Sequence, residues 1–116
     1  MRRGDIYLAD LDPTRGSETS KHRPVVIVSN DGANGTASRL GRGVVTVVPV
    51  TSNVARVYPF QVLLQAGESG LRHASKAQAE QVRSIAVERL GNRRIGRLGS
   101  ASLRALDDAL RLHLAL

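Results

Sequence analysis

The sequence predicts a small α+β domain made of several short strands and one C-terminal helix. Its apolar residues gather in short runs rich in valine and isoleucine, which is typical of strands. Clusters of glycine, asparagine, aspartate and proline separate these runs. Only about the last seventeen residues carry leucines at the spacing of three and four that is typical of a helix. With 116 residues, 41% of them hydrophobic, we expect one domain over residues 1–116, folded as a partly closed barrel.

Three strands are predicted in the first half of the chain. They cover Ile6–Leu11, Pro24–Ser29 and Gly43–Val50, and the second is so rich in β-branched residues that both its faces should be buried. Asp12-Pro13 ends the first strand with turn residues. The segment Asn30–Arg42 is rich in glycine and asparagine and has few apolar anchors, so we expect a long, partly mobile loop there.

The second half predicts shorter elements. The segment Ser75–Ile85 is ambiguous, because its alanine and glutamine residues favour a helix while Val82–Ile85 alternates like a strand. The residues alone leave both possibilities open. The remaining expectations are a strand at Pro59–Leu64, a turn at Gly67–Gly70, a tight turn at Val87–Leu90 and a last short strand at Arg93–Leu98.

The final segment, Ser100–Leu116, predicts a helix. Its apolar stripe consists of Leu103, Leu106, Leu110 and Leu114. Ser100 or Ser102 is expected to cap it, and Asp107 and Arg111 are expected to pair one turn apart on the wet face. Leu112 and Leu116 lie off the stripe, which indicates a second contact surface.

The charge balance favours a polyanionic partner. Seventeen Lys and Arg residues oppose ten Asp and Glu, giving a formal charge of +7, and fifteen of the cations are arginine. Neutralising phosphates releases counterions, so nucleic acid is the favoured partner, although solubility and an arginine-rich codon usage explain the same excess. The chain has no cysteine, and its three histidines are scattered, so we expect no disulfide, no metal site and no cofactor. No apolar leader or membrane span is predicted, which fits a cytoplasmic protein.

The candidate chemistry centres on Arg23 and Thr51. Arg23 lies where a polar loop meets a strand, and Thr51 lies where another strand ends, so a barrel can bring both to one rim. A guanidinium beside a hydroxyl suits a phosphodiester whose charge rises in the transition state. RNA supplies its own 2′-hydroxyl nucleophile, and Glu18 is a candidate titrating partner. A surface ion pair of Arg23 with Glu18 or Asp31, and a turn role for Thr51, stay open as alternatives.

Five segments stand out along the chain: Arg3-Gly-Asp-Ile-Tyr7, Gly16-Ser-Glu18, Arg23-Pro-Val-Val-Ile-Val-Ser-Asn-Asp31, Pro49-Val-Thr-Ser52 and Glu80-Gln-Val-Arg-Ser-Ile85. In this order and approximate spacing they resemble the MazF/PemK family of toxin endoribonucleases, and most of all its actinobacterial MazF members. The resemblance covers nearly the whole chain and implies an SH3-like barrel with a C-terminal helix that works as a homodimer. It also implies metal-independent cleavage of single-stranded RNA to 2′,3′-cyclic phosphate and 5′-hydroxyl ends, restrained by an antitoxin with an acidic, disordered tail.

The same resemblance implies roles for individual residues. Arg23 matches the family's essential arginine and would stabilise the phosphorane charge and relay a proton, while Thr51 would bind the scissile phosphate. It further implies that the segment containing Gln81 and Arg83 is a strand. The remaining RNA contacts would come from Glu18, Lys21, Ser52, Asn53, Tyr58, Gln81 and Arg83. Two alternatives are a CcdB-type toxin that poisons gyrase, and a non-catalytic RNA-binding module of the same fold.

Overall fold

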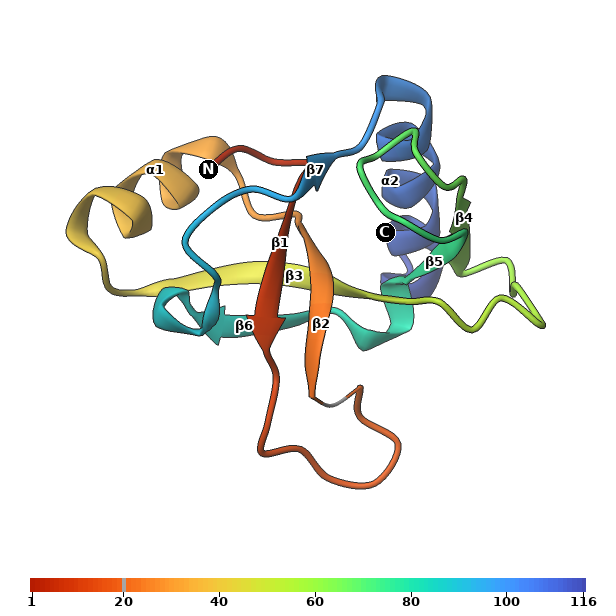
Figure 1. Ribbon diagram of the computed structural model, residues 1–116, viewed down its shortest axis with the longest axis horizontal. Helices are drawn as coiled ribbons and strands as arrows, with labels where there is room; N and C mark the ends of the chain where they lie inside the picture. The colour runs from red at the N-terminus through yellow and green to blue at the C-terminus, as the bar shows by residue number, and fades with distance from the viewer. Residues whose placement is uncertain (20) are drawn as a thin grey trace.

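The computed structural model describes residues 1–19 and 21–116, and shows a curled antiparallel sheet with a helix at either side (Figure 1). The α+β prediction is therefore confirmed. In chain order the described elements are β1 (Asp5–Asp10), β2 (His22–Ile27), α1 (Asp31–Leu40), β3 (Val44–Thr51), β4 (Gln61–Leu64), β5 (Ser75–Gln78), the 3₁₀ turn η1 (Ala79–Gln81), β6 (Arg83–Ala86), the 3₁₀ turn η2 (Val87–Arg89), β7 (Gly96–Arg97) and α2 (Ser100–Leu114).

Strand β3 is the centre of the sheet. The strand order is β4-β5-β3-β2-β1-β7, and β6 pairs with β3 as well. The first half of β3 pairs with β6 from Val44 to Val47, whereas its last two residues, Val50 and Thr51, pair with Ala77 and Lys76 of β5. Because successive parts of one strand pair with different partners, the sheet curls around β3 into a partly closed barrel.

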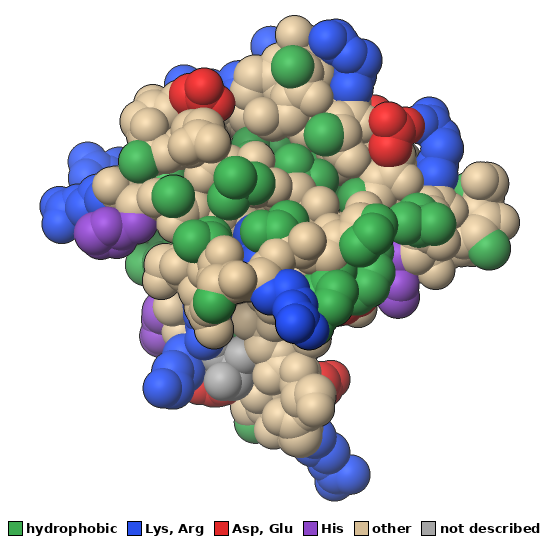
Figure 2. Space-filling view, turned by 90° about the vertical axis from the view of Figure 1, so that its right-hand side faces the viewer, with side chains coloured by type: hydrophobic (Ala, Val, Ile, Leu, Met, Phe, Trp, Pro, Cys, Tyr) green, Lys and Arg blue, Asp and Glu red, His purple; other side chains and the backbone are tan. Residues whose placement is uncertain are grey.

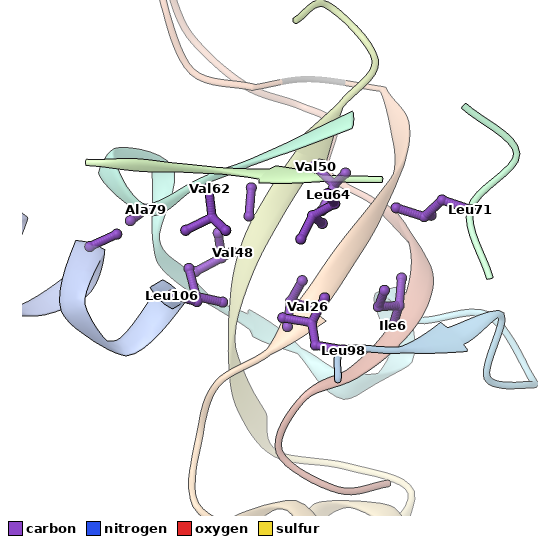
Figure 3. Packing of buried hydrophobic residues seen from close by; sticks show 12 residues of the cluster. Ile6, Val26, Val48, Val50, Val62, Leu64, Leu71, Ala79, Leu98 and Leu106 are labelled. Atoms are coloured by element: carbon purple, nitrogen blue, oxygen red, sulfur yellow. The ribbon is translucent and has the colours of Figure 1, made fainter. Parts of the chain in front are cut away.

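The sheet buries a core on each face. Side chains alternate along a strand, so Val26 of β2 packs towards α2 while its neighbours Val25 and Ile27 pack on the opposite face. Figure 3 shows the α2 side, where Val26 and Leu106 lie within one apolar cluster. The prediction that the second strand is buried on both faces is confirmed, since Val25, Val26 and Ile27 are each fully buried.

Helix α1 corrects the prediction of a mobile loop over residues 30–42. The Asn30 side chain accepts a hydrogen bond from the Ala33 N–H at 2.8 Å and caps the first turn, and Gly41 ends the helix with φ of 66°. Asn34 is completely buried, and its amide group donates to the Ser29 carbonyl at 2.8 Å. Residues that favour turns in isolation therefore serve here as caps and as an anchor to the segment that follows β2.

Helix α2 has the predicted position but differs in detail. Leu106 is fully buried and Leu103 and Leu110 pack against the same core, but Leu114 is 48% exposed. Gly99 occupies the N-cap position and provides no side-chain cap, so the serine cap is wrong. The Asp107–Arg111 pair is also wrong. Arg111 bonds Asp108 at 3.1 Å, and Asp107 bonds Arg3 at 2.7 Å.

The ambiguous segment at residues 75–85 contains two strands and no α-helix. Strands β5 and β6 lie at its ends, as the family resemblance implies for the Arg83 part, but Ala79–Gln81 between them forms a 3₁₀ turn. Pairing of both strands with β3 outweighs the helical propensity of the alanines. The tight turn predicted at Val87–Leu90 corresponds to η2, and the last strand is shorter than predicted.

The N-terminal Arg3-Gly-Asp segment joins several elements. Arg3 donates through its backbone N–H to the Asp31 carboxylate at 2.7 Å, and its Nε donates to the Val28 carbonyl at 2.9 Å. Asp5 is buried and its carboxylate accepts from Arg97. These contacts, together with the Arg3–Asp107 pair, tie α1, α2 and β7 to the edge of the sheet.

Candidate nucleic-acid site

Arg23 and Thr51 lie next to each other at one end of the sheet. Strands β2 and β3 are antiparallel with Val25 opposite Pro49, and the same register extended by two residues sets Arg23 opposite Thr51. The Arg23 Nη1 lies 3.5 Å from the Thr51 Oγ1. The two residues predicted from separate strand ends are therefore brought together by strand pairing.

The Thr51 hydroxyl is oriented by its neighbours. Its oxygen receives the long contact from Arg23 and a second one from the Asn53 backbone N–H at 3.3 Å. A threonine hydroxyl has two acceptor lone pairs and one donor hydrogen. Both donors approach the oxygen of the Thr51 hydroxyl. The hydroxyl hydrogen can therefore be donated to an anionic oxygen.

The Arg23–Thr51 pair opens on a pocket of about 460 Å³. Its polar rim carries arginine, histidine and hydroxyl groups, and its apolar floor includes Val50 and Leu71. Among the lining residues that the structure describes there is no aspartate or glutamate, so the pocket suits an anion with an apolar neighbour. The lining residues are His22, Arg23, Pro24, Val50, Thr51, Ser52, Gly70, Leu71, Arg72, His73, Ser75 and Ile95.

Ser52 and Asn53 continue from the same strand end. Ser52 is exposed and lines the pocket. Asn53 is also exposed, and its Oδ1 accepts from the Ala55 N–H at 3.3 Å, which turns the chain away after β3. Ser52 therefore shares the Arg23 pocket, while Asn53 adjoins it through its backbone contact with Thr51.

Glu18 lies in the loop between β1 and β2, and its carboxylate accepts a hydrogen bond from the Arg15 N–H within that loop. Gln81, the last residue of η1, anchors the same loop. Its Nε2 donates to the Ser17 carbonyl at 3.0 Å, and its Oε1 accepts from the Thr19 N–H at 3.1 Å. Gln81 thus fixes the loop that carries Glu18, and neither residue lines the Arg23 pocket.

Lys21 and Arg83 meet at the end of β1. The Leu11 N–H donates to the Lys21 carbonyl at 3.0 Å, and the Arg83 Nη1 donates to the Leu11 carbonyl at 3.4 Å. Lys21 is exposed, whereas Arg83 is half-buried. Both cations therefore lie beside the base of the β1–β2 loop, as a source of positive potential for that side of the molecule.

Tyr58 lies in a separate aromatic and cationic group. Its ring stacks on Phe60 with centroids 5.3 Å apart and planes within 3°. The Arg56 guanidinium lies 5.6 Å, and the buried Lys76 ammonium 6.0 Å, from the centre of the Tyr58 ring. Tyr58 as a whole is 41% exposed, so it keeps an accessible surface. Figure 2 shows hydrophobic side chains gathered across the face formed by β4, β5 and α2.

Sequence reasoning missed two members of the pocket, Arg72 and His73. Both are exposed and lie in the segment that leads into β5. Their only sequence signal is a pair of basic residues between a glycine turn and a strand, which is common on protein surfaces. Their significance comes from the pairing of β5 with β3, a long-range contact that local sequence does not reveal.

Neither a metal site nor a membrane-spanning helix is found in the part of the chain that the structure describes. Within residues 1–19 and 21–116, no group of three or more histidine, aspartate or glutamate side chains is arranged to hold a metal ion. None of the helices in that part of the chain has the length and apolar character to cross a membrane.

The fold and pocket define a small curled-sheet domain with a cationic pocket at one strand end. A family model described as "PemK-like, MazF-like toxin of type II toxin-antitoxin system" matches residues 2–114. The chain therefore belongs to the PemK/MazF toxin family, and the family resemblance is confirmed.

Relatives of known sequence or structure agree with this placement. Endoribonuclease MazF9 of Mycobacterium tuberculosis is 66% identical over 116 residues, spanning 100% of this chain and 98% of the relative. The Mycobacterium tuberculosis toxin MazF-mt6 aligns with a TM-score of 0.76 at 28% identity, over 97% of each chain. A mycobacterial endoribonuclease in complex with its cognate antitoxin has the same fold, with a TM-score of 0.78 at 23% identity over 100% of this chain and 96% of its own.

Proposed function

We propose that this chain is an endoribonuclease toxin that cleaves single-stranded RNA without a metal ion. The contact between Arg23 and Thr51 on the rim of a cationic pocket is the observation that carries the proposal. The similarity to Endoribonuclease MazF9 over the full chain supports it. The products would be a 2′,3′-cyclic phosphate and a 5′-hydroxyl, because RNA provides its own nucleophile next to the scissile phosphate.

The chemistry follows from where charge develops. As the 2′-oxygen attacks phosphorus, the non-bridging phosphate oxygens gain negative charge in a crowded five-coordinate transition state. The Arg23 guanidinium and the Thr51 O–H are donors aimed at that charge, and donors fixed in advance stabilise it without reorganisation. The strand pairing of β2 with β3 keeps the two groups in register during the reaction.

The RNA is proposed to extend from the pocket along neighbouring polar and aromatic groups. Ser52 and Asn53 lie next to the scissile phosphate, and Tyr58 presents an exposed ring for stacking with a base. Lys21 and Arg83 supply positive potential at the β1–β2 loop, where Gln81 and Glu18 are held.

The same charge supports a protein partner. We include in this proposal a cognate antitoxin whose acidic, disordered tail covers the cationic pocket, because a +7 chain favours an acidic segment that folds on binding. A homodimer in the cytoplasm completes the proposal. Leu112 and Leu114 in the last turn of α2 and Leu116 just beyond it are exposed, which supports it, because exposed apolar side chains offer a contact surface to another chain.

Cleavage of a single-stranded RNA in excess EDTA tests the proposal. Thr51→Val removes the hydroxyl with little change in volume. Arg23→Lys keeps the positive charge but loses the paired N–H donors of the planar guanidinium. Each variant should reduce the cleavage rate by about 10²–10³-fold. Thr51→Ser keeps the hydroxyl and should retain most activity. The matched controls are Thr36→Val and Arg104→Lys, at exposed positions of α1 and α2.

Full activity of Thr51→Val or Arg23→Lys would contradict the proposed site. Loss of cleavage when EDTA is added would contradict metal independence. A wild-type chain that binds RNA but never cleaves it would instead identify the non-catalytic RNA-binding module.

A further inference from the structure

Glu80 is a half-buried carboxylate that takes no part in the proposed RNA contacts. It lies in η1, where its Oε2 accepts a hydrogen bond from the Gln61 Nε2 at 2.6 Å. Its Oε1 is buried and has no hydrogen-bond partner among residues 1–19 and 21–116. Burying a carboxylate oxygen without a partner costs free energy, so a role for this side chain is expected.

Gln61 links the Glu80 carboxylate to Tyr58. The aromatic turn, Tyr58–Gln61, is a β-turn with Pro59 at its second position, closed by a hydrogen bond from the Gln61 N–H to the Tyr58 carbonyl at 2.9 Å. The Gln61 side chain is buried, and its Oε1 accepts a hydrogen bond from the Tyr58 N–H at 3.1 Å. One glutamine therefore binds both backbone polar groups of Tyr58.

Glu80 determines which way the Gln61 amide faces. A carboxylate only accepts hydrogen bonds, whereas an amide has a donor end and an acceptor end. The Nε2 end therefore faces Glu80, and the Oε1 end faces the Tyr58 N–H. If the amide were turned the other way, its oxygen would meet the carboxylate and its NH₂ group would meet another N–H, so both hydrogen bonds would be lost.

The aromatic turn carries the exposed Tyr58 ring. This ring stacks on the Phe60 ring, with centroids 5.3 Å apart, and the Tyr58 hydroxyl accepts from the exposed Arg56 guanidinium at 3.2 Å. Both rings belong to the turn that Gln61 closes. Holding the backbone of this turn therefore also holds the stacking surface.

Strand β5 connects the aromatic turn to the end of β3. Lys76 of β5 lies directly opposite Thr51, and Gln78, two residues further along, lies opposite Gln61. The buried Lys76 ammonium also donates to the Arg56 carbonyl at 2.6 Å. The aromatic turn is therefore held at a fixed position relative to Thr51.

We propose that Gln61 and Glu80 are positioning residues for RNA. They hold the Tyr58 ring where it stacks on a base, while Arg23 and Thr51 hold the scissile phosphate. This step rests on the proposed function, to which it adds the two residues that set the distance between the stacked base and the cleaved bond. Because they act on the base and not on the phosphate, their loss should raise KM and leave kcat nearly unchanged.

An exchange of the two side chains tests the proposal. Gln61→Glu sets two carboxylates face to face and should raise KM for single-stranded RNA by about 5- to 100-fold, the range expected for the loss of one stacked base. Adding Glu80→Gln restores a donor between the two positions, while the carboxylate introduced at position 61 still accepts from the Tyr58 N–H. The double variant should therefore recover most of the wild-type KM. Gln65→Glu and Glu68→Gln, at exposed positions, are the matched controls.

Tyr58 fluorescence measures the stacking itself. The chain has two tyrosines and no tryptophan, so a Tyr7→Phe background leaves Tyr58 as its one tyrosine. A single-stranded RNA with 2′-O-methyl groups throughout has no free 2′-hydroxyl and cannot be cleaved. Its binding should quench Tyr58 in the background chain and in the double variant, and much less in Gln61→Glu. A merely structural role would lower the urea midpoint without changing the quenching of the folded protein.

A KM for Gln61→Glu within about twofold of the Gln65→Glu control would overturn the proposal, because a stacked base is worth more than that. So would a double variant that is no better than Gln61→Glu, or a fall in kcat at constant KM. If Gln61→Glu does not fold, Glu80→Ala removes the acceptor without adding charge and should raise KM in the same way.

The uncleavable RNA separates this proposal from the proposed function. Quenching of Tyr58 that follows the predicted pattern, without cleavage of ordinary RNA, would refute the nuclease function and support the positioning role. A wild-type chain that neither binds nor cleaves single-stranded RNA would refute both.

Discussion

Gly96 passes so close to Ser69 that a Cβ atom on Gly96 would lie 1.7 Å from the Ser69 carbonyl oxygen. A Cβ on Gly70, which has φ of +86°, would lie 2.6 Å from the Ile95 carbonyl oxygen. The two backbone segments therefore cross in direct contact, and the Arg97 N–H donates to the Ser69 carbonyl at 3.1 Å. This crossing fixes the wall of the Arg23 pocket, since Gly70 and Ile95 both line it.

Gly96→Ala is expected to destabilise the domain and to reduce its proposed activity together. The obstacle at Gly96 is backbone and cannot rotate away, so the segments must separate, which costs about 1–3 kcal/mol by analogy with overpacked cores. Urea unfolding measures the stability change. The RNA-cleavage assay of the folded variant shows whether the pocket wall has moved. An unchanged urea midpoint would show that the Ser69 and Gly96 segments can accommodate a Cβ atom without loss of stability, which would contradict their close contact.

Gly35→Ala provides the opposite case and is expected to stabilise the domain. Gly35 lies on exposed α1, where an added Cβ meets nothing within 4 Å. Alanine has higher helix propensity and restricts the unfolded chain more than glycine, which is worth about 0.4–1 kcal/mol. The urea midpoint should rise, with RNA cleavage unchanged. A fall in stability would show that α1 at this position needs the freedom of glycine.

The strands and α2 follow from local pattern, but α1 does not. Short runs of β-branched residues directly indicate strands buried in a sheet. The spacing of the leucines indicates which side of α2 faces the core. The α1 segment contains Gly32, Gly35 and Asn34, all poor helix formers, so propensity opposes the observed helix. What stabilises it is the local Asn30 cap and the burial of Asn34, whose amide bonds Ser29 just after β2, and that burial depends on the tertiary fold.

The site was predictable where it depends on strand ends and not where it depends on pairing between distant segments. Arg23 and Thr51 border long, clear strands, so their meeting at one rim followed from the expected barrel. Arg72 and His73 enter the pocket only because β5 pairs with the end of β3. Gln81, which the family resemblance predicts as an RNA contact, hydrogen-bonds the loop that carries Glu18.

Removal of the buried amide in Asn34→Ala is expected to destabilise the domain. The Asn34 amide donates to the Ser29 carbonyl at 2.8 Å, and its Oδ1 accepts from the Ser29 hydroxyl. Alanine leaves the Ser29 carbonyl and the Ser29 hydroxyl hydrogen without these partners in a partly buried place, at a cost of about 1–3 kcal/mol. Urea unfolding with Ser38→Ala as an exposed α1 control measures the change. Equal stability of the two variants would count against the buried anchor.

The carboxylate of Asp31 makes a pH-dependent contribution to stability. The hydrogen bond from the Arg3 backbone N–H holds the pKa of Asp31 below its ordinary value of 3.8. A carboxyl whose pKa is lowered by folding stabilises the folded state above the ordinary value, and this contribution is lost as the pH falls through the folded pKa. Asp31→Asn should therefore lower the Tm at neutral pH.

The difference in Tm between wild type and Asp31→Asn is the measurement to follow. It should shrink as the pH is lowered below 3.8, because the wild-type carboxyl then becomes neutral like the amide. Glu68→Gln removes a similar charge from an exposed turn and controls for the change in net charge. A Tm difference for Asp31→Asn that stays constant from neutral to acidic pH would show that the amide acts by shape and not by the loss of charge at the start of α1.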